Sequence, residues 1–227
     1  VWAAPATAPP RWLARRRARG GAAPLRVERF AEDSLNNRFA LQRRPAAGAV
    51  FSVDDDVILA CADLRRLVDA WAAAPANMAG VAPRLVARDA RTRRWRYLRS
   101  WHVWWTGRFS LVLTKAAVLH RDHFAAYRAP ALAAARARVD AGRNCEDLLM
   151  ACVVANATRA PPLWVSARYV DRGQALLGLG GHQGISAAAG HVAARGECLD
   201  AFAGPFGGLP LATGAAKLSD ARAAWLW

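Results

Sequence analysis

The chain has 227 residues, of which 54% are hydrophobic and 10 are tryptophan, so it can bury a sizeable core and is not intrinsically disordered. Its net charge of +15 is typical of proteins that bind nucleic acid. However, Lys115 and Lys217 are the only lysines, which leaves 30 arginines among the 32 basic residues, spread through an alanine-rich background. Because this pattern indicates compositional bias, we expect no nucleic-acid partner. The sequence also contains no apolar run near the roughly 18 residues that a membrane-spanning helix requires.

The pattern of apolar residues predicts alternating strands and helices. We expect an exposed loop over residues 1–24, a strand over 25–30, and then a short helical segment that Ser34 caps. The strands expected after that point cover residues 50–53, 80–86, 95–105, 109–113 and 163–170. The expected helices cover residues 63–74, 121–126, 131–140, 146–156 and 191–203. This alternation indicates an α/β architecture.

Three consecutive aspartates, Asp54, Asp55 and Asp56, follow the apolar strand predicted over residues 50–53. A continuous apolar run of this length is typical of a buried strand. If the extended geometry continues, Asp54 and Asp56 project to one face and Asp55 to the other. Carboxylates at the carboxyl end of a strand lie where open α/β sheets bind ligands, and they suit a hard divalent cation that also binds nucleotide phosphates. A solvated acidic cluster before a turn is the alternative.

Two clusters in the second half of the chain can complete such a site. Asn144 is a good N-cap, and Glu146 and Asp147 fall in the first turn of the predicted helix, where acids also complement the helix dipole. His191 and Arg195 are four residues apart and therefore share a helix face. An arginine in this position can neutralise a departing diphosphate through paired hydrogen bonds. A dipole-complementing role for the acids and a surface position for the arginine are the alternatives.

Two other segments leave their roles open. Four tryptophans, Trp95, Trp101, Trp104 and Trp105, lie in the predicted strand 95–105. Tryptophans in strands are mostly core residues, and the alternative is that they stack on an acceptor sugar or contact a lipid. The glycine-rich segment 178–184 is either a mobile flap over a bound ligand or a plain linker.

Taken together, these motifs resemble the exostosin-type glycosyltransferases of glycosyltransferase family 64. The matching segments are residues 33–39 (Asp-Ser-Leu-Asn-Asn-Arg-Phe), residues 50–57 with the three aspartates, and residues 144–147 (Asn-Cys-Glu-Asp). They occur in the family's order and at similar spacing. Residues 100–107 and 110–115 look most like the plant members, which act on glycosyl inositol-phosphoceramides. The resemblance covers residues 25–212, which is most of the chain.

The resemblance implies a GT-A fold and a Mn²⁺-dependent, retaining transfer of an N-acetylglucosamine-type sugar from a UDP-sugar to a glycan or sphingolipid-linked acceptor. It implies that Asp56 binds the metal, that Asp147 is the catalytic carboxylate, and that Arg195 lies near the leaving group. The residues expected to line the nucleotide are Asn37, Arg38, Asp54, Asp55 and His191. Cys145 and Cys198 match a pair that is disulfide-bonded in the family.

The resemblance also implies a single GT-A domain over residues 1–227, with the nucleotide-binding part in residues 1–60 and the acceptor and catalytic part in residues 61–227. Because the family's first strand and helix would lie before Val1, we expect an N-terminally incomplete domain. The family implies a membrane-anchored protein of the Golgi or endoplasmic reticulum lumen, and the glycosylation sequon at Asn156 agrees with this. The family resemblance is also compatible with a homo-oligomer, or with a hetero-oligomer that contains another transferase.

One departure from the family supports an alternative function. The family usually has asparagine where this chain has Asp33, at a position that contacts the nucleotide. An added negative charge there can weaken donor binding. Together with the missing N-terminal strand, this aspartate motivates the alternative of a catalytically inactive family member that serves as a partner or scaffold for another transferase.

Overall fold

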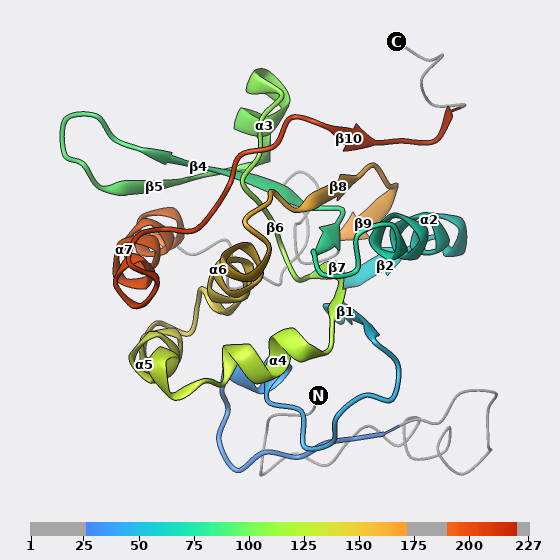
Figure 1. Ribbon diagram of the computed structural model, residues 1–227, viewed down its shortest axis with the longest axis horizontal. Coiled ribbons are helices and arrows are strands. Elements are labelled where there is room, and N and C mark those ends of the chain that lie inside the picture. The colour runs from blue at the N-terminus through green and yellow to red at the C-terminus, as the bar shows by residue number, and fades with distance from the viewer. Residues whose placement is uncertain (1–25, 172–189, 222–227) are drawn as a thin grey trace, which may run out of the picture.

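A mixed five-stranded β-sheet organises the computed structural model, which describes residues 26–171 and 190–221. Its strands are β1 (Ala49–Val53), β3 (Ala79–Gly80), β7 (Ala116–His120), β8 (Leu163–Val165) and β10 (Lys217–Leu218). Their order across the sheet is β1-β7-β3-β8-β10. β7 is antiparallel to both of its neighbours, whereas β3, β8 and β10 are parallel. In the described part of the chain β1 is an outermost strand, so the aspartates that follow it leave the sheet at its border (Figure 1).

Two smaller sheets extend from this one. The first pairs β2 (Val57–Leu59) with β9 (Tyr169–Asp171), and the second has the order β5-β4-β6, with β4 (Pro83–Arg88), β5 (Trp95–Leu98) and β6 (Leu111–Val112). A close approach links the second sheet to the first. A Cβ on Gly80 of β3 would lie 2.7 Å from Cγ2 of Val112, so only glycine lets these two backbones pack so closely.

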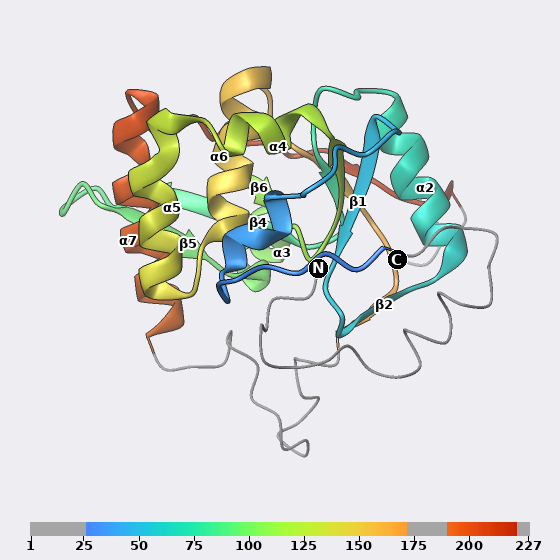
Figure 2. The ribbon, with the colours of Figure 1, turned by 90° about the horizontal axis from the view of Figure 1, so that it is seen from below.

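Helices cover both faces of the main sheet. They are α2 (Cys61–Ala72), α3 (Ser100–Thr106), α4 (Asp122–Tyr127), α5 (Ala133–Gly142), α6 (Glu146–Thr158) and α7 (His191–Ala203), with the 3₁₀ segments η1 (Leu35–Phe39), η2 (Pro130–Leu132) and η5 (Gly204–Phe206). Figure 2 shows α2 on one side of β1, and α5, α6 and α7 together on the other side. The fold is therefore layered as helix, sheet and helix.

The alternation of side chains along β7 explains this layering. Ala116 and Val118 belong to the hydrophobic cluster that contains Trp71 of α2. Ala117 and Leu119 point the other way, into the larger cluster that contains the apolar residues of α6. A strand that is buried on both faces must be apolar at every position, as β7 is until its last residue.

This mixed sheet between two helical layers confirms the predicted α/β class and is consistent with a GT-A-like fold. The predicted helices all occur within a few residues of their expected bounds, and Ser34 caps η1 by accepting a hydrogen bond from the amide of Asn36. None of the helices in the described residues combines the length and apolar character needed to cross a bilayer.

Four predicted strands are wrong in part. The segment 80–86 divides between β3 and β4, because β3 pairs in the main sheet and β4 pairs with β5 and β6. Residues 26–30 form only an isolated bridge at Arg29 rather than a strand. The segment 95–105 is extended only over β5, because α3 begins at Ser100 and ends where Gly107 adopts a left-handed conformation at φ 66°. The segment 163–170 divides between β8 and β9, because its two ends pair with different sheets. The predicted loop 1–24 and the glycine-rich segment 178–184 lie outside the described residues.

Candidate active site

The three aspartates stand in a turn between β1 and β2. The amide of Asp54 donates to the carbonyl of Lys115 at 3.0 Å, and the carbonyl of Asp54 accepts from the amide of Val57 at 3.2 Å. Because β1 ends at Val53, the predicted strand alternation does not extend to Asp55 and Asp56. Asp54 and Asp56 are nevertheless half-buried while Asp55 is exposed. The turn, rather than strand alternation, therefore gives Asp55 a different environment from the other two aspartates. The predicted strand itself is confirmed, but it is half-buried from Val50 to Ser52 and exposed at Val53 rather than buried.

Arg38 of η1 reaches the same turn. Its Nη2 donates to Oδ1 of Asp54 in an ion pair, and its Nη1 donates to Oγ1 of Thr114 at 3.1 Å. The same Nη1 lies 3.9 Å from Oε1 of Glu146, at the start of α6. Burial raises the pKa of Asp54 above its usual value, and the nearby charge of Arg38 opposes this rise. Arg38 therefore connects the aspartate turn to the carboxylates of α6.

Asp55 and Asp56 are the aspartates of this turn that remain available for a cation, and Asp56 is the more buried of the two. Neither makes an ion pair with another described residue, while the Asp54 carboxylate is taken by Arg38. Carboxylate oxygens are the ligands that Mn²⁺ and Mg²⁺ prefer. The described residues hold no group of three or more His, Cys, Asp or Glu side chains positioned as a metal cage. The carboxylates of Asp55 and Asp56 could share a cation with the phosphates of a ligand.

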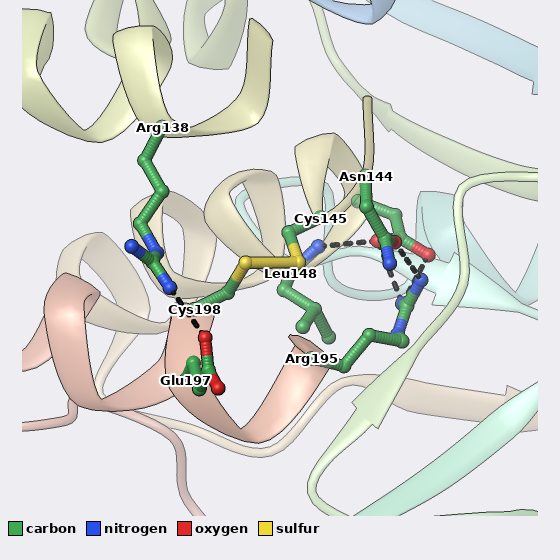
Figure 3. The surroundings of a disulfide bond; sticks show 8 residues. Arg138, Asn144, Cys145, Leu148, Arg195, Glu197 and Cys198 are labelled. Atoms are coloured by element: carbon green, nitrogen blue, oxygen red, sulfur yellow. Dashed lines mark hydrogen bonds and ion pairs between the residues drawn. A yellow bond between two sulfur atoms is a disulfide. The ribbon is translucent and has the colours of Figure 1, made fainter. Parts of the chain in front are cut away.

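The start of α6 supplies the second half of the site. Asp147 is buried, and both of its carboxylate oxygens accept hydrogen bonds from Nη2 of Arg195, at 2.7 and 2.6 Å. Nη1 of Arg195 donates to Oδ1 of Asn144 at 3.1 Å, and Figure 3 shows these two side chains pointing toward each other. Asp147 and Arg195, which are 48 residues apart in the chain, thus form one buried ion pair.

Close packing of α7 against β5 holds Arg195 in place. The guanidinium carbon of Arg195 lies 4.5 Å from the centre of the Tyr97 ring, which is a cation–π distance. A Cβ on the neighbouring Gly196 would lie 3.0 Å from the carbonyl oxygen of Trp95, so a side chain there would push α7 away from β5. The Nε of Arg195 is buried and has no hydrogen-bond partner within residues 26–171 and 190–221.

The two adjacent acids of α6 have opposite electrostatic environments. Burial opposes ionisation of Asp147, but the charge and hydrogen bonds of Arg195 prevail and hold its pKa below the usual value. Burial, followed by the negative charge of Asp147, raises the pKa of Glu146 to about 7. The site therefore contains one fixed carboxylate and one carboxyl group that exchanges its proton near neutral pH.

A disulfide joins the two helices that carry this ion pair. Cys145, just before α6, is bonded to Cys198 in α7, as the family resemblance implied (Figure 3). An exposed ion pair, in which Arg138 of α5 donates to Glu197 at 2.9 Å, lies nearby. The disulfide and the Asp147–Arg195 pair together fix α7 relative to the start of α6.

The remaining predicted residues are placed less directly. His191 is the first residue of α7, and burial and the charge of Arg195 lower its pKa. Asn37 is buried, and its side-chain amide donates to the carbonyl of Glu32 at 2.8 Å, so it shapes the chain before η1. Asp33, the departure from the family, forms an exposed ion pair with Arg143 at 2.7 Å, which offsets its added negative charge.

Two contacts of the site were not predicted. The link between Arg38 and Glu146 joins segments that are far apart in the chain, and the stacking of Tyr97 on Arg195 depends on how α7 packs on β5. The position of Glu146 beside the catalytic candidate Asp147 was the one available signal for the first contact.

Comparison with known proteins agrees with this geometry. A model of the glycosyl transferase family 64 domain matches residues 1–223. The chain is 36% identical over 206 residues to Arabidopsis thaliana glycosylinositol phosphorylceramide mannosyl transferase 1, a match that covers 89% of this chain and 59% of that protein. It is 33% identical over 191 residues to human exostosin-2 and 30% identical over 190 residues to zebrafish exostosin-1b. These matches cover 83% and 84% of this chain and 25% of each relative, so the chain spans only part of the proteins that it resembles. The chain belongs to glycosyl transferase family 64.

Proposed function

We propose that the chain forms the catalytic domain of a retaining glycosyltransferase, which moves a sugar from a UDP-sugar to a glycan or glycolipid acceptor. The observation that carries this proposal is the continuity of charge across the site. Arg38 pairs with Asp54 on one side and lies 3.9 Å from Glu146 on the other. Glu146 adjoins Asp147, which Arg195 holds. A donor whose nucleotide lies at the end of β1 can therefore extend its sugar toward the carboxylates of α6.

A divalent cation, Mn²⁺ in the family resemblance, belongs to this proposal. Asp56 would hold it, together with the diphosphate of the donor, while Asp54 and Asp55 add negative charge on the same turn. Bound there, the ion would act as a Lewis acid on the leaving diphosphate. Arg38 is positioned by Asp54 and supplies further positive charge beside the same group.

Asp147 is proposed to act on the sugar or the acceptor. Because Arg195 keeps it ionised and fixes both of its oxygens, it can orient an acceptor hydroxyl or stabilise positive charge on the sugar. In a retaining transfer without a covalent intermediate, the acceptor attacks from the face that the diphosphate leaves. If an Asp147→Asn variant kept most of the wild-type turnover, this role would be wrong.

The identities of the sugar and the acceptor are finer proposals. An N-acetylglucosamine-type sugar is the expectation from the family resemblance alone. The Arabidopsis relative is named as a mannosyl transferase that acts on glycosylinositol phosphorylceramide. A donor screen therefore has to include nucleotide-activated mannose beside UDP-N-acetylglucosamine, and the acceptors have to include glycans and sphingolipid-linked glycans.

We also propose that the protein works in the lumen of the Golgi or endoplasmic reticulum, either as a homo-oligomer or together with another transferase. The disulfide between Cys145 and Cys198 supports an oxidising compartment. In the cytosol a bond of this kind is rarely maintained.

Calorimetric titration of UDP, with and without Mn²⁺, tests the donor site. Wild-type protein is expected to bind UDP more tightly when Mn²⁺ is present, and Asp56→Ala is expected to lose this difference. Asp69→Ala is the matched control, because Asp69 is an exposed acid on α2 and lies outside the aspartate turn. A folded wild-type protein that binds UDP equally well without metal would contradict the assignment of Asp56.

The same experiment separates the scaffold alternative. A folded protein that binds no UDP and turns over no donor, but co-purifies with an active transferase, would be a scaffold. Donor turnover by the chain alone would exclude that alternative.

A further inference from the structure

Helix α3 carries three tryptophans on its outer surface. Trp101, Trp104 and Trp105 are 61%, 80% and 85% exposed. Their spacing of three and four residues places them on one face of the helix. Val103 is fully buried on the opposite face, where α3 packs on β4. In Figure 1 α3 stands out from the body of the molecule. We name the surface formed by these three side chains the tryptophan face.

So much exposed aromatic surface requires an explanation beyond folding. A tryptophan side chain can bury about 150–250 Å², and contiguous exposed apolar patches above a few hundred Å² mark interaction sites. The interpretation of these tryptophans as core residues, which the predicted strand favoured, is therefore wrong for Trp101, Trp104 and Trp105. Because these side chains are exposed, we infer that they contact a partner, and the kind of partner has to be identified.

The charges around the tryptophan face identify the kind of partner. The sequence has no acidic residue between Asp89 and Asp122. Two acids from α7, Glu197 and Asp200, line a pocket together with Trp101, and each of them is paired with an arginine. Arg99 and Arg108 flank α3, both are exposed, and neither makes an ion pair with another described residue. Tryptophan favours the boundary between lipid headgroups and acyl chains, and arginine binds the phosphates of anionic lipids. A surface of this composition is complementary to an anionic bilayer.

The same features disfavour two other occupants. A symmetric contact between two copies of the tryptophan face would bring Arg99 and Arg108 of each chain near those of the other, without acids on α3 to offset them. A glycan that stacks on one ring gains specificity from neighbouring walls, whereas the side chains of Trp104 and Trp105 are 80% and 85% exposed and so have few neighbouring atoms.

We propose that α3 docks the protein on an anionic membrane surface, with Trp101, Trp104 and Trp105 inserted at the headgroup level and with Arg99 and Arg108 bound to lipid phosphates. This docking does not depend on catalysis.

The position of α3 links the docking to the candidate active site, and this link rests on the proposed function. α3 directly follows β5, whose Tyr97 stacks on Arg195. Arg99 lies between β5 and α3, and its positive charge helps to lower the pKa of His191 at the start of α7. A membrane held at the tryptophan face would therefore lie beside the candidate active site, where the headgroup of a lipid acceptor can enter it.

Flotation of the 227-residue chain with vesicles tests the docking in the absence of donor and metal. Vesicles of phosphatidylcholine alone are compared with vesicles that also contain phosphatidylserine. Wild-type protein is expected to float with the anionic vesicles, and W104A/W105A is expected to bind them at least ~10-fold more weakly. Replacement of Arg99 and Arg108 by glutamine is expected to weaken binding roughly fivefold per charge and to remove much of the salt dependence.

The chain offers a matched control for exposed apolar surface. Ile58 and Val170 face each other across β2 and β9 and are 49% and 58% exposed. I58A/V170A should bind vesicles as wild type does. Unchanged melting temperatures of all variants would show that binding, not folding, has changed, and W104F/W105F, which keeps the aromatic character, should restore part of the binding.

Three results would overturn the proposal. They are wild-type protein that does not float with anionic vesicles, W104A/W105A that binds as wild type does, and a concentration-dependent dimer that only this variant loses. Because no nucleotide is used, failure here is distinguishable from failure of the proposed UDP site.

Discussion

The α6–α7 half of the candidate site and the β1–η1 half hold their charges in different ways. On the α6–α7 side, Asp147 and Arg195 are buried, share two short hydrogen bonds and are braced by the nearby disulfide. On the β1–η1 side, the side chains of Asp54 and Arg38 are 28% and 27% exposed, and Asp56 stands in a turn without an ion-pair partner among the described residues.

This difference suggests which part of the site is complete before a ligand binds. A buried ion pair is costly to break, so its geometry is fixed in the free protein. Half-exposed groups in a turn retain contact with water and can exchange it for a cation or a phosphate. We infer that the α6–α7 half is preorganised, and that the donor and its metal complete the β1–η1 half.

The strongest test of the preorganised half is Arg195→Met. This change removes the charge but keeps much of the side-chain volume, and it leaves Asp147 buried without its partner. We expect the free energy of unfolding to fall by about 3–5 kcal/mol. Urea denaturation measures this change. Arg138→Met is the control, because it breaks the exposed pair with Glu197 and should cost only about 0–1 kcal/mol. Equal losses in the two variants would refute the comparison.

The disulfide should contribute to the free energy of unfolding by an amount similar to that of the buried ion pair. Cys145 and Cys198 are 53 residues apart, and closing a loop of this size stabilises the fold by about 4 kcal/mol in the chain-entropy model. The double variant Cys145→Ser/Cys198→Ser should show this loss in urea denaturation. Cys61→Ser controls for removal of a thiol, because Cys61 is exposed and unpaired. A double variant as stable as this control would show that the bond does not brace α7.

Glu146 links the two halves, and its titration should be visible in stability. Its pKa is raised to about 7 from an ordinary 4.5, so the folded state binds this proton more tightly than the unfolded chain does. Stability is therefore lost as pH rises from 4.5 to about 7, by about 3 kcal/mol over the whole window. Glu146→Gln should remove this loss, measured as the difference between the two stability curves.

The variant is needed because other groups titrate nearby. His191 has a lowered pKa, so its contribution is present above its ordinary value of 6.5 and is lost as pH falls. Asp147 also has a lowered pKa, and its contribution is lost only as pH falls below its ordinary value of 3.8. A constant difference between wild type and Glu146→Gln across pH 4.5 to 7 would rule out the assignment.

The sequence predicted the fold best where the signal is local. The helix 191–203 was predicted to the residue because Gly190 precedes it and its apolar residues continue through Phe202. Strand β7 was missed, because Ala116 and Ala117 have little strand propensity and the strand is defined by its partners on both sides. The aromatic residues of α3 suggested a strand, although Gly107 is a helix-ending signal.

For the site, motifs identified the residues but not their connections. The resemblance indicated Asp147, Arg195 and the disulfide, and the structure brings these together. Apart from the position of Glu146 beside Asp147, no sequence pattern indicates that Arg38 reaches Glu146, because this contact depends on where η1 packs relative to α6. Contacts between distant segments follow from tertiary packing, and the local spacing of residues in a single sequence does not predict them.

The smallest stability effect is expected at the half of the site that a ligand completes. Asp56→Ala removes a carboxylate that has no ion-pair partner among the described residues, so the free energy of unfolding should change by no more than about 0.5 kcal/mol. The change also removes a negative charge that contributes to the raised pKa of Asp54, and this should lower the pKa of Asp54. Urea denaturation beside Asp69→Ala measures the first effect, and NMR titration of the Asp54 carboxyl measures the second. A loss as large as that of Arg195→Met would mean that Asp56 is structural, whereas an unchanged stability with lost metal-dependent UDP binding would show that its carboxylate serves the ligand rather than the fold.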